Sequence, residues 1–76
     1  MKTRKFRALV NERGLDDGGV ASFTFEVAVL TKGKIYEEHQ QYTNKGYVPS
    51  GYVIDDNSCW NDIKAKDFKK RFEEII

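Results

Sequence analysis

This chain contains one histidine and one cysteine, His39 and Cys59, and they are its only candidates for a soft nucleophile and its base. A cysteine–histidine dyad requires the two side chains within hydrogen-bonding reach, and usually a third group that orients the histidine. The two residues belong to different predicted elements, and no local motif surrounds either of them. We therefore predict a half-buried structural cysteine, a histidine on a strand surface and a protein without catalytic activity.

The acidic residues give no better support for a metal site. Asp55 and Asp56 are adjacent, so their side chains diverge, and no further acidic or histidine ligand follows at a helical or loop spacing. A single cysteine with a single histidine also excludes the usual Cys/His zinc frameworks. The glycine-rich segment 14–19 lacks the Gly-Lys-Ser/Thr ending of a phosphate loop, and its pair of aspartates would repel phosphate. The sequence therefore predicts no metal and no cofactor.

The composition is that of one small globular domain. The chain has 76 residues, of which 39% are hydrophobic and 33% charged, and its formal net charge is +1. This length supports a single domain over residues 1–76 with one small core. A lone cysteine cannot form an internal disulfide, so we expect a reducing, cytoplasmic environment. A chain of this kind that begins at Met1 is expected to be a complete small gene product of bacterial or phage type.

The sequence gives no indication of a membrane protein. Its N-terminus is basic but has no apolar segment behind it, which argues against a signal peptide. No apolar run approaches the roughly 20 residues that a membrane-spanning helix needs. We therefore expect no membrane among the partners of this chain.

Alternating apolar and polar residues predict three strands, at 4–12, 21–31 and 34–43. The segment 16–19, Asp-Asp-Gly-Gly, predicts the first turn between them. Lys32 and Gly33 predict a tight hairpin turn, with Gly33 in a left-handed conformation. The pattern is typical of an antiparallel meander.

A two-residue turn at positions 32–33 fixes the pairing of the second and third strands by counting. Tyr36 and Tyr42 would then face the core, and His39 would lie on the polar face beside Glu26. The predicted pairs are Phe23 with Tyr42, Glu26 with His39, Val29 with Tyr36 and Leu30 with Ile35.

The C-terminal third predicts a helix. Apolar residues from Ala65 to Ile76 form one stripe at helical spacing, and Asp56, Asn57 or Ser58 could cap the start of the helix. Trp60 is expected in the core. The segment 48–51, Val-Pro-Ser-Gly, predicts a type I turn, and residues 52–54 could add a short fourth strand. The sequence therefore predicts an α+β fold: a three-stranded antiparallel β-meander with one C-terminal α-helix packed on one sheet face.

The function that this composition favours is protein binding. Such a module needs a rigid scaffold, aromatic anchors and a mixed-charge rim, and no catalytic group. The turn around Pro49 presents rigid aromatic surface, and an open sheet face would add a small apolar patch that suits a partner or a homodimer. We expect an inhibitor, adaptor or regulatory protein, encoded by a phage or a bacterium. The predicted contact residues are Tyr47, Val48, Pro49, Tyr52, Leu30 and Ile35.

Nucleic-acid binding is the alternative, because some DNA-binding domains insert a sheet into the major groove. The open sheet face and a basic N-terminal arm would then make the contacts. The residues concerned are Lys2, Arg4, Lys5, Arg7, His39 and Gln41. Glu26 and Glu37 on the same predicted face, together with the low net charge, argue against this alternative.

Overall fold

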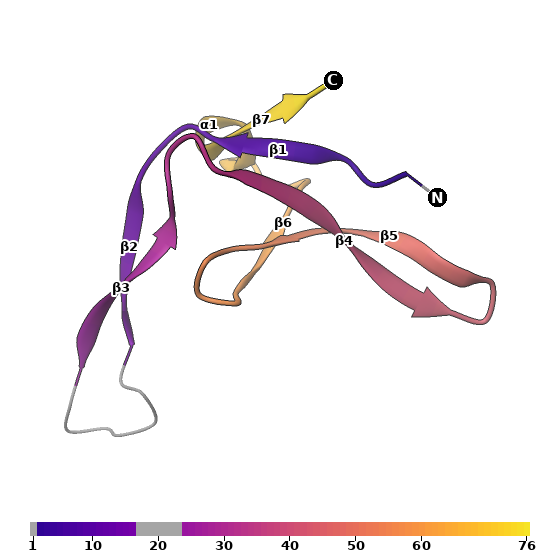
Figure 1. The fold of residues 1–76 in the computed structure, drawn as a ribbon, viewed down its shortest axis with the longest axis horizontal. Helices are drawn as coiled ribbons and strands as arrows, with labels where there is room; N and C mark the ends of the chain where they lie inside the picture. The colour runs from indigo at the N-terminus through magenta and orange to yellow at the C-terminus, as the bar shows by residue number, and fades with distance from the viewer. Residues whose placement is uncertain (1, 17–23) are drawn as a thin grey trace.

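The computed structural model describes residues 2–16 and 24–76, which form seven β-strands and one helical turn (Figure 1). Five strands make an antiparallel sheet in the order β6-β5-β4-β1-β7, and β2 pairs with β3 in a separate two-stranded sheet. The elements are β1 (Lys5–Ala8), β2 (Glu12–Asp16), β3 (Phe25–Leu30), β4 (Ile35–Thr43), β5 (Gly46–Ile54), β6 (Trp60–Asp62), α1 (Phe68–Arg71) and β7 (Phe72–Ile75). Residues 17–19 of the turn predicted at 16–19 fall outside the described residues, as does Phe23 of the predicted pair with Tyr42.

The predicted α+β fold is wrong, because the described chain is mostly β-structure. α1 is only four residues long, far below what a helix needs to cross a membrane, and it is the only α-helix in residues 2–16 and 24–76. Of the apolar stripe predicted from Ala65 to Ile76, Phe68 in this turn and Phe72 directly after it are buried, whereas Ala65 and Ile76 are exposed. The chain then continues as strand β7.

Strand β7 gives the acidic C-terminus partners that a helix would not provide. Its residues pair with β1, so that Glu73 lies opposite Arg7 and Phe72 lies opposite Ala8. The carboxylate of Glu73 is 3.7 Å from the guanidinium of Arg7. Negative charge in the last turn of a helix would oppose the helix dipole. The extended conformation avoids this and extends the sheet by one edge strand.

The two sheets are the two halves of one bent ribbon. In the first half Phe6 on β1 lies opposite Tyr36 on β4, and in the second half Glu12 on β2 lies opposite Leu30 on β3. Glu12 comes six residues after Phe6, and Leu30 comes six residues before Tyr36. The register of the antiparallel pairing is therefore continuous across the bend. The β2–β3 half leaves the five-stranded sheet at a sharp corner (Figure 1).

The corner lies at Thr31–Lys34, where the sequence predicts a hairpin turn. Gly33 has the predicted left-handed conformation, with φ of +86°. The pairing of the second and third predicted strands with each other is wrong, however, because β3 pairs with β2 and the first part of β4 pairs with β1. Ala8 explains the difference: its N–H donates to the carbonyl of Lys34 at 3.0 Å, and its carbonyl accepts from the N–H of Gly33 at 2.9 Å.

Asp56 fixes this corner from the other side of the fold. Its carboxylate accepts hydrogen bonds from the hydroxyl of Thr31 at 2.8 Å and from the ammonium of Lys34 at 2.6 Å. Partial burial raises the pKa of Asp56, but the bonds from Lys34 and Thr31 outweigh it, and the pKa is lowered overall. The backbone N–H of Asp56 also donates to the carbonyl of Val29 at 2.8 Å. The predicted role of this segment as a helix start is wrong, because it is the turn between β5 and β6.

Strands β4 and β5 form a long hairpin. The tight turn at Asn44 and Lys45 is followed by Gly46 at φ +97°. Gln40 lies opposite Pro49, whereas Glu38 lies opposite Val53, so the three residues 50–52 of β5 oppose one residue of β4. This β-bulge stands where the sequence predicts a type I turn, and that turn is therefore wrong. Pro49 is tolerated because β6 pairs only with residues 52–54 of β5, which leaves this part of β5 at an edge.

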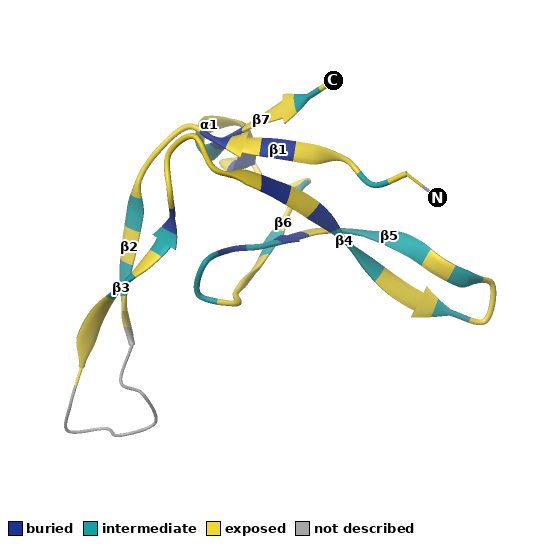
Figure 2. Cartoon of the chain, in the orientation of Figure 1, coloured by how far each residue is buried: buried dark blue, intermediate teal, exposed yellow. Residues whose placement is uncertain are grey.

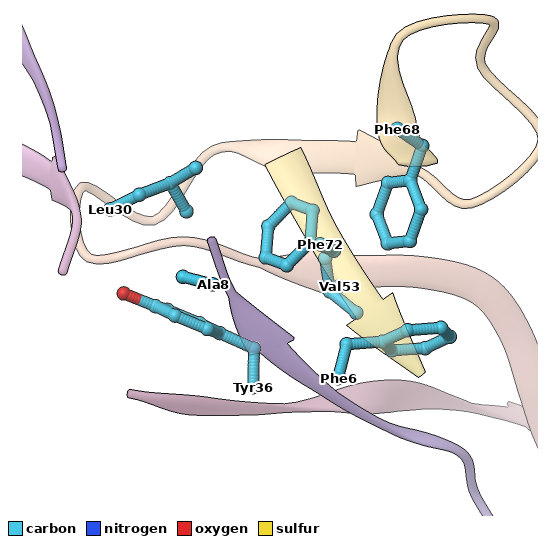
Figure 3. Close-up of a cluster of buried hydrophobic side chains, with 7 residues drawn as sticks. All are labelled: Phe6, Ala8, Leu30, Tyr36, Val53, Phe68 and Phe72. Atoms are coloured by element: carbon cyan, nitrogen blue, oxygen red, sulfur yellow. The ribbon is translucent and has the colours of Figure 1, made fainter. Parts of the chain in front are cut away.

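The core lies on the inner face of β1, β4 and β5, beneath α1 and the start of β7 (Figure 3). Phe68 stacks on Phe72 with ring centroids 4.5 Å apart, and it meets Phe6 edge to face at 5.1 Å. Tyr36 contacts Phe72 edge to face at 5.7 Å. The buried apolar residues are Phe6, Ala8, Leu30, Tyr36, Val53, Phe68 and Phe72. The predicted core position of Tyr36 is therefore confirmed.

Glu38 places a carboxylate at the edge of this core, with its side chain only 3% exposed. It accepts a hydrogen bond from Nη2 of Arg4 at 3.1 Å and another from the N–H of Gly51 in the bulge, also at 3.1 Å. The bond from the Arg4 side chain lowers the pKa of Glu38, and burial only partly offsets this effect. One carboxylate thus joins the N-terminal arm, β4 and β5.

We predict that Glu38→Gln lowers the free energy of unfolding by roughly 2 kcal/mol at pH 7, because charge-assisted hydrogen bonds become neutral ones. A lowered pKa in the folded state stabilises the fold above the ordinary glutamate pKa of about 4.3. This stabilisation is lost as the pH falls through the pKa of folded Glu38. Urea unfolding at several pH values measures both effects, and the difference between the two proteins should vanish in acid. The matched control is Glu37→Gln at the exposed neighbouring position. An equal loss in both variants would contradict the role of Glu38.

Candidate functional site

The β4–β5 hairpin contains a long stretch without acidic residues. None of the 12 aspartates and glutamates of the chain falls within residues 39–54. This stretch covers the outer part of β4 and all of β5, where side chains are mostly exposed or half-buried (Figure 2). Charged residues are depleted in the centres of protein interfaces, whereas Tyr and Trp are enriched there. The aromatic residues on and beside this hairpin are therefore its candidate contact residues.

Two tyrosines form a cross-strand pair near the end of the hairpin, here called the tip pair. Tyr42 and Tyr47 are directly opposite each other in the β4–β5 ladder, and their ring centroids are 5.2 Å apart. Their side chains remain 73% and 62% exposed. The predicted core position of Tyr42 is wrong, because the hairpin extends beyond the layer that α1 and β7 cover.

A second group of rings, here called the Trp60 cluster, lies where β4, β5 and β6 meet. The Trp60 ring contacts the His39 ring edge to face at 4.7 Å and the Tyr52 ring edge to face at 5.5 Å. Trp60 is 56% exposed, so its predicted core position is wrong. Alternation along β4 puts His39 and Tyr42 on opposite faces of the ribbon. The hairpin therefore presents aromatic rings on both faces.

The β-bulge holds Tyr52 in this cluster. The hydroxyl of Ser50 donates to the carbonyl of His39 at 2.8 Å and accepts from the N–H of Tyr52 at 3.3 Å. Gly51 between them has φ of +81°, a conformation that favours glycine. Its N–H binds the buried carboxylate of Glu38. The bulge thus couples the Trp60 cluster to the core.

Four of the six predicted contact residues lie together on one strand, and the other two lie elsewhere. Tyr47, Val48, Pro49 and Tyr52 all lie on β5, with Val48 and Pro49 half-buried. Ile35 is 43% exposed at the far end of β4. Leu30 is only 2% exposed, so its predicted position on an open face is wrong. It lies in the core because the corner at Thr31 turns it inward.

Sequence reasoning missed Tyr42 and Trp60 as surface residues. The absence of acidic residues from 39–54 was the signal that could have found Tyr42, because charged residues are depleted in the centres of interfaces. Trp60 lies outside this stretch, between Asp56 and Asp62, and no comparable signal marked it.

The residues predicted for nucleic-acid binding do not form one basic face. Lys5 is opposite Glu37 and Arg7 is paired with Glu73, so the outer face of β1 carries balanced charges. Arg4 is bound to Glu38. Of the remaining predicted residues, Lys2 lines a groove beside Tyr52, Gln41 is exposed on β4 and His39 packs on Trp60.

The residues with potential chemistry have structural contacts. The predicted pair of Glu26 with His39 is wrong, because Glu26 binds Arg13 at 2.8 Å. Cys59 is exposed rather than half-buried. Asp55 accepts hydrogen bonds from the N–H groups of Asn57 and Cys59, both at 2.9 Å, and so closes the β5–β6 turn. Within residues 2–16 and 24–76 no group of three or more acidic, histidine or cysteine side chains could hold a metal ion.

Known proteins add nothing to this description: no protein-family model, curated protein or solved structure matches the chain.

We predict that Gly51→Ala lowers the free energy of unfolding by about 1 kcal/mol, because alanine disfavours a positive φ. A Cβ atom at this position would meet no other atom within 4 Å, so crowding cannot contribute. Urea unfolding followed by Trp60 fluorescence measures the change. Gly51→Asn is the matched control, since asparagine tolerates this conformation better and should lose less stability. Equal stability of Gly51→Ala and wild type would show that the bulge does not depend on glycine.

Proposed function

We propose that this chain is a small protein-binding module that acts by occupying a partner's surface, as an inhibitor, adaptor or regulatory protein. The observation that carries the proposal is the aromatic surface of the β4–β5–β6 region, defined by the tip pair and the Trp60 cluster. Three of its rings, those of Tyr42, Tyr47 and Trp60, are between 56% and 73% exposed. Tyr42 and Tyr47 lie within the stretch 39–54, which carries no carboxylate.

The rigidity of these rings favours binding through them. Tyr and Trp contribute large contact areas with few rotatable bonds, and they dominate binding energy in many interfaces. Here each exposed ring already touches another ring, as Tyr42 touches Tyr47 and Trp60 touches His39. Side chains that are held in place lose less entropy on binding. The aromatic surface is therefore preorganised for contact.

The proposal includes no catalytic step and no cofactor. Its partner is another protein or a second copy of the chain, and both would meet the same aromatic surface. A reducing compartment such as the cytoplasm suits the exposed thiol of Cys59. A source in a phage or bacterium belongs to the same proposal, since small inhibitors of this kind act on host or neighbouring proteins.

Nucleic-acid binding is a second candidate, supported by one observation. Lys2, Arg4 and Lys64 line the same groove as Tyr52, which would suit phosphates beside a stacked base. The balanced charges of β1 and the net charge of +1 make it the weaker candidate. Titration with DNA and RNA oligonucleotides at low and moderate salt tests it, and an absence of binding at low salt would remove it.

We predict that the double variant Tyr42→Ser/Tyr47→Ser, and separately Trp60→Ser, binds the protein partner at least tenfold more weakly. A tenfold loss corresponds to about 1.4 kcal/mol, which is typical for the truncation of an aromatic anchor. The partner is first captured with the wild-type chain as bait and identified, and its Kd for each purified variant is then measured by calorimetry. Light scattering of the chain alone tests self-association.

The matched control is Leu15→Ser, which removes another exposed apolar side chain, 76% exposed, from the separate β2–β3 ribbon. It should leave the Kd unchanged. Circular dichroism checks that every variant is folded. Wild-type affinity in folded variants of both aromatic groups would remove the aromatic surface as the contact site.

A further inference from the structure

A groove of about 600 Å³ adjoins the aromatic surface. It lies between the N-terminal arm, the β-bulge and the end of β6, and Tyr52 and Pro49 contribute to its wall. Lys2, Arg4 and Lys64 line it as well. The groove is therefore a cationic site with an aromatic side, directly next to the proposed contact surface.

Two carboxylates, Glu38 and Asp62, also line this groove. Glu38 is buried and accepts hydrogen bonds from Arg4 and from the N–H of Gly51. Asp62 is exposed and accepts a hydrogen bond from the backbone N–H of Lys64 at 2.9 Å, so it keeps its negative charge, but Lys2 and Lys64 together outnumber it. Arg4 is neutralised by Glu38.

Two lysines remain to attract a ligand. Among the residues that the structure describes, neither Lys2 nor Lys64 has an ion pair. Lys2 and Lys64 are both exposed. Two ammonium groups beside an aromatic ring suit a carboxylate-bearing segment with an apolar or aromatic side chain.

We propose that this groove receives an acidic segment of the protein partner while the aromatic surface holds the partner's apolar side chains. This inference rests on the proposed function, which it extends by naming the partner's chemistry: an extended acidic stretch next to an apolar or aromatic residue. The segment's carboxylates bind the ammonium groups of Lys2 and Lys64, and its apolar residue packs on Tyr52.

Charge favours an acidic protein segment over a nucleic acid. A longer phosphate chain would need basic residues beyond the groove, and on the outer face of β1 the charges of Lys5 and Arg7 are balanced by Glu37 and Glu73. It would also gain little from the release of counterions, since the chain's net charge is only +1. A short acidic segment needs only the two lysines of the groove.

The test uses the peptide acetyl-Glu-Glu-Phe-Glu-Glu-amide as a probe, titrated into the ¹⁵N-labelled full chain. We expect saturable shifts of the amide signals of Gly51, Tyr52 and Lys64, and affinity that falls as salt is added. The same peptide with lysines in place of its glutamates should cause none. No saturable shift at about 10 mM peptide, a concentration that reveals even millimolar binding, would overturn the inference.

Charge variants locate the site. Lys64→Glu and Lys2→Glu should each weaken peptide binding at least fivefold, and Lys64→Gln should do so by a smaller factor. Lys66→Glu makes the same change of charge on an exposed residue outside the groove, and it should have little effect. An equal loss in Lys64→Glu and Lys66→Glu would show a general charge effect and would refute the groove.

Two further results separate this inference from its alternatives. Displacement of the peptide by a single-stranded oligonucleotide at a lower concentration would overturn it in favour of nucleic acid. With the captured partner, wild-type affinity in Lys64→Glu together with weakened binding in Tyr42→Ser/Tyr47→Ser would refute the groove and keep the proposed function.

Discussion

The buried carboxylate of Glu38 is the interaction on which the arrangement of this protein depends. It lies where the β4–β5 ladder changes register, and it binds the Arg4 side chain and the N–H of Gly51 at the same time. Burial of a carboxylate is unfavourable unless donors replace its water. Those donors come from the N-terminal arm and from the bulge, so the ionised form of Glu38 requires both to be in place. The position of Tyr52, and with it the Trp60 cluster, follows from this requirement.

A second constraint is the small number of residues that the core can bury. Only seven apolar residues of the described chain are buried, and the molecule extends 44 × 30 × 20 Å. Two ribbons, β2–β3 and the outer part of β4–β5, reach beyond this core (Figure 2). A two-stranded ribbon has no second layer to cover its side chains. Its aromatic residues therefore pack against each other across the strands, as Tyr42 and Tyr47 do.

Sequence patterns correctly predicted structural features that depend on residues close together in the sequence. Alternation placed Tyr36 correctly in the core, and the turn signal placed Gly33 correctly in a left-handed conformation. The corner could not be predicted, because bonds from Ala8 and Asp56, distant in sequence, turn the chain there. The C-terminal strand was missed for a related reason. Phe68 and Phe72 have helical spacing, but pairing with β1 decides the conformation after the first turn.

The exposure of the rings in the candidate site also could not be predicted from residue type. Residue type alone suggested that Trp60 belongs in a core, since large apolar side chains are usually buried. Whether a ring is buried depends on what lies over its strand, and none of the described elements lies over this end of the sheet. The absence of carboxylates from residues 39–54 carries different information, because it describes the surface as a whole. It implies that the hairpin itself carries no negative charge. Of the carboxylates beside it, Glu38 points inward and is neutralised by Arg4, whereas Asp62 lies opposite Tyr52 on β6. Lys2 and Lys64 line the groove beside Tyr52 and outnumber Asp62 there, which is the arrangement that an acidic, apolar partner would complement.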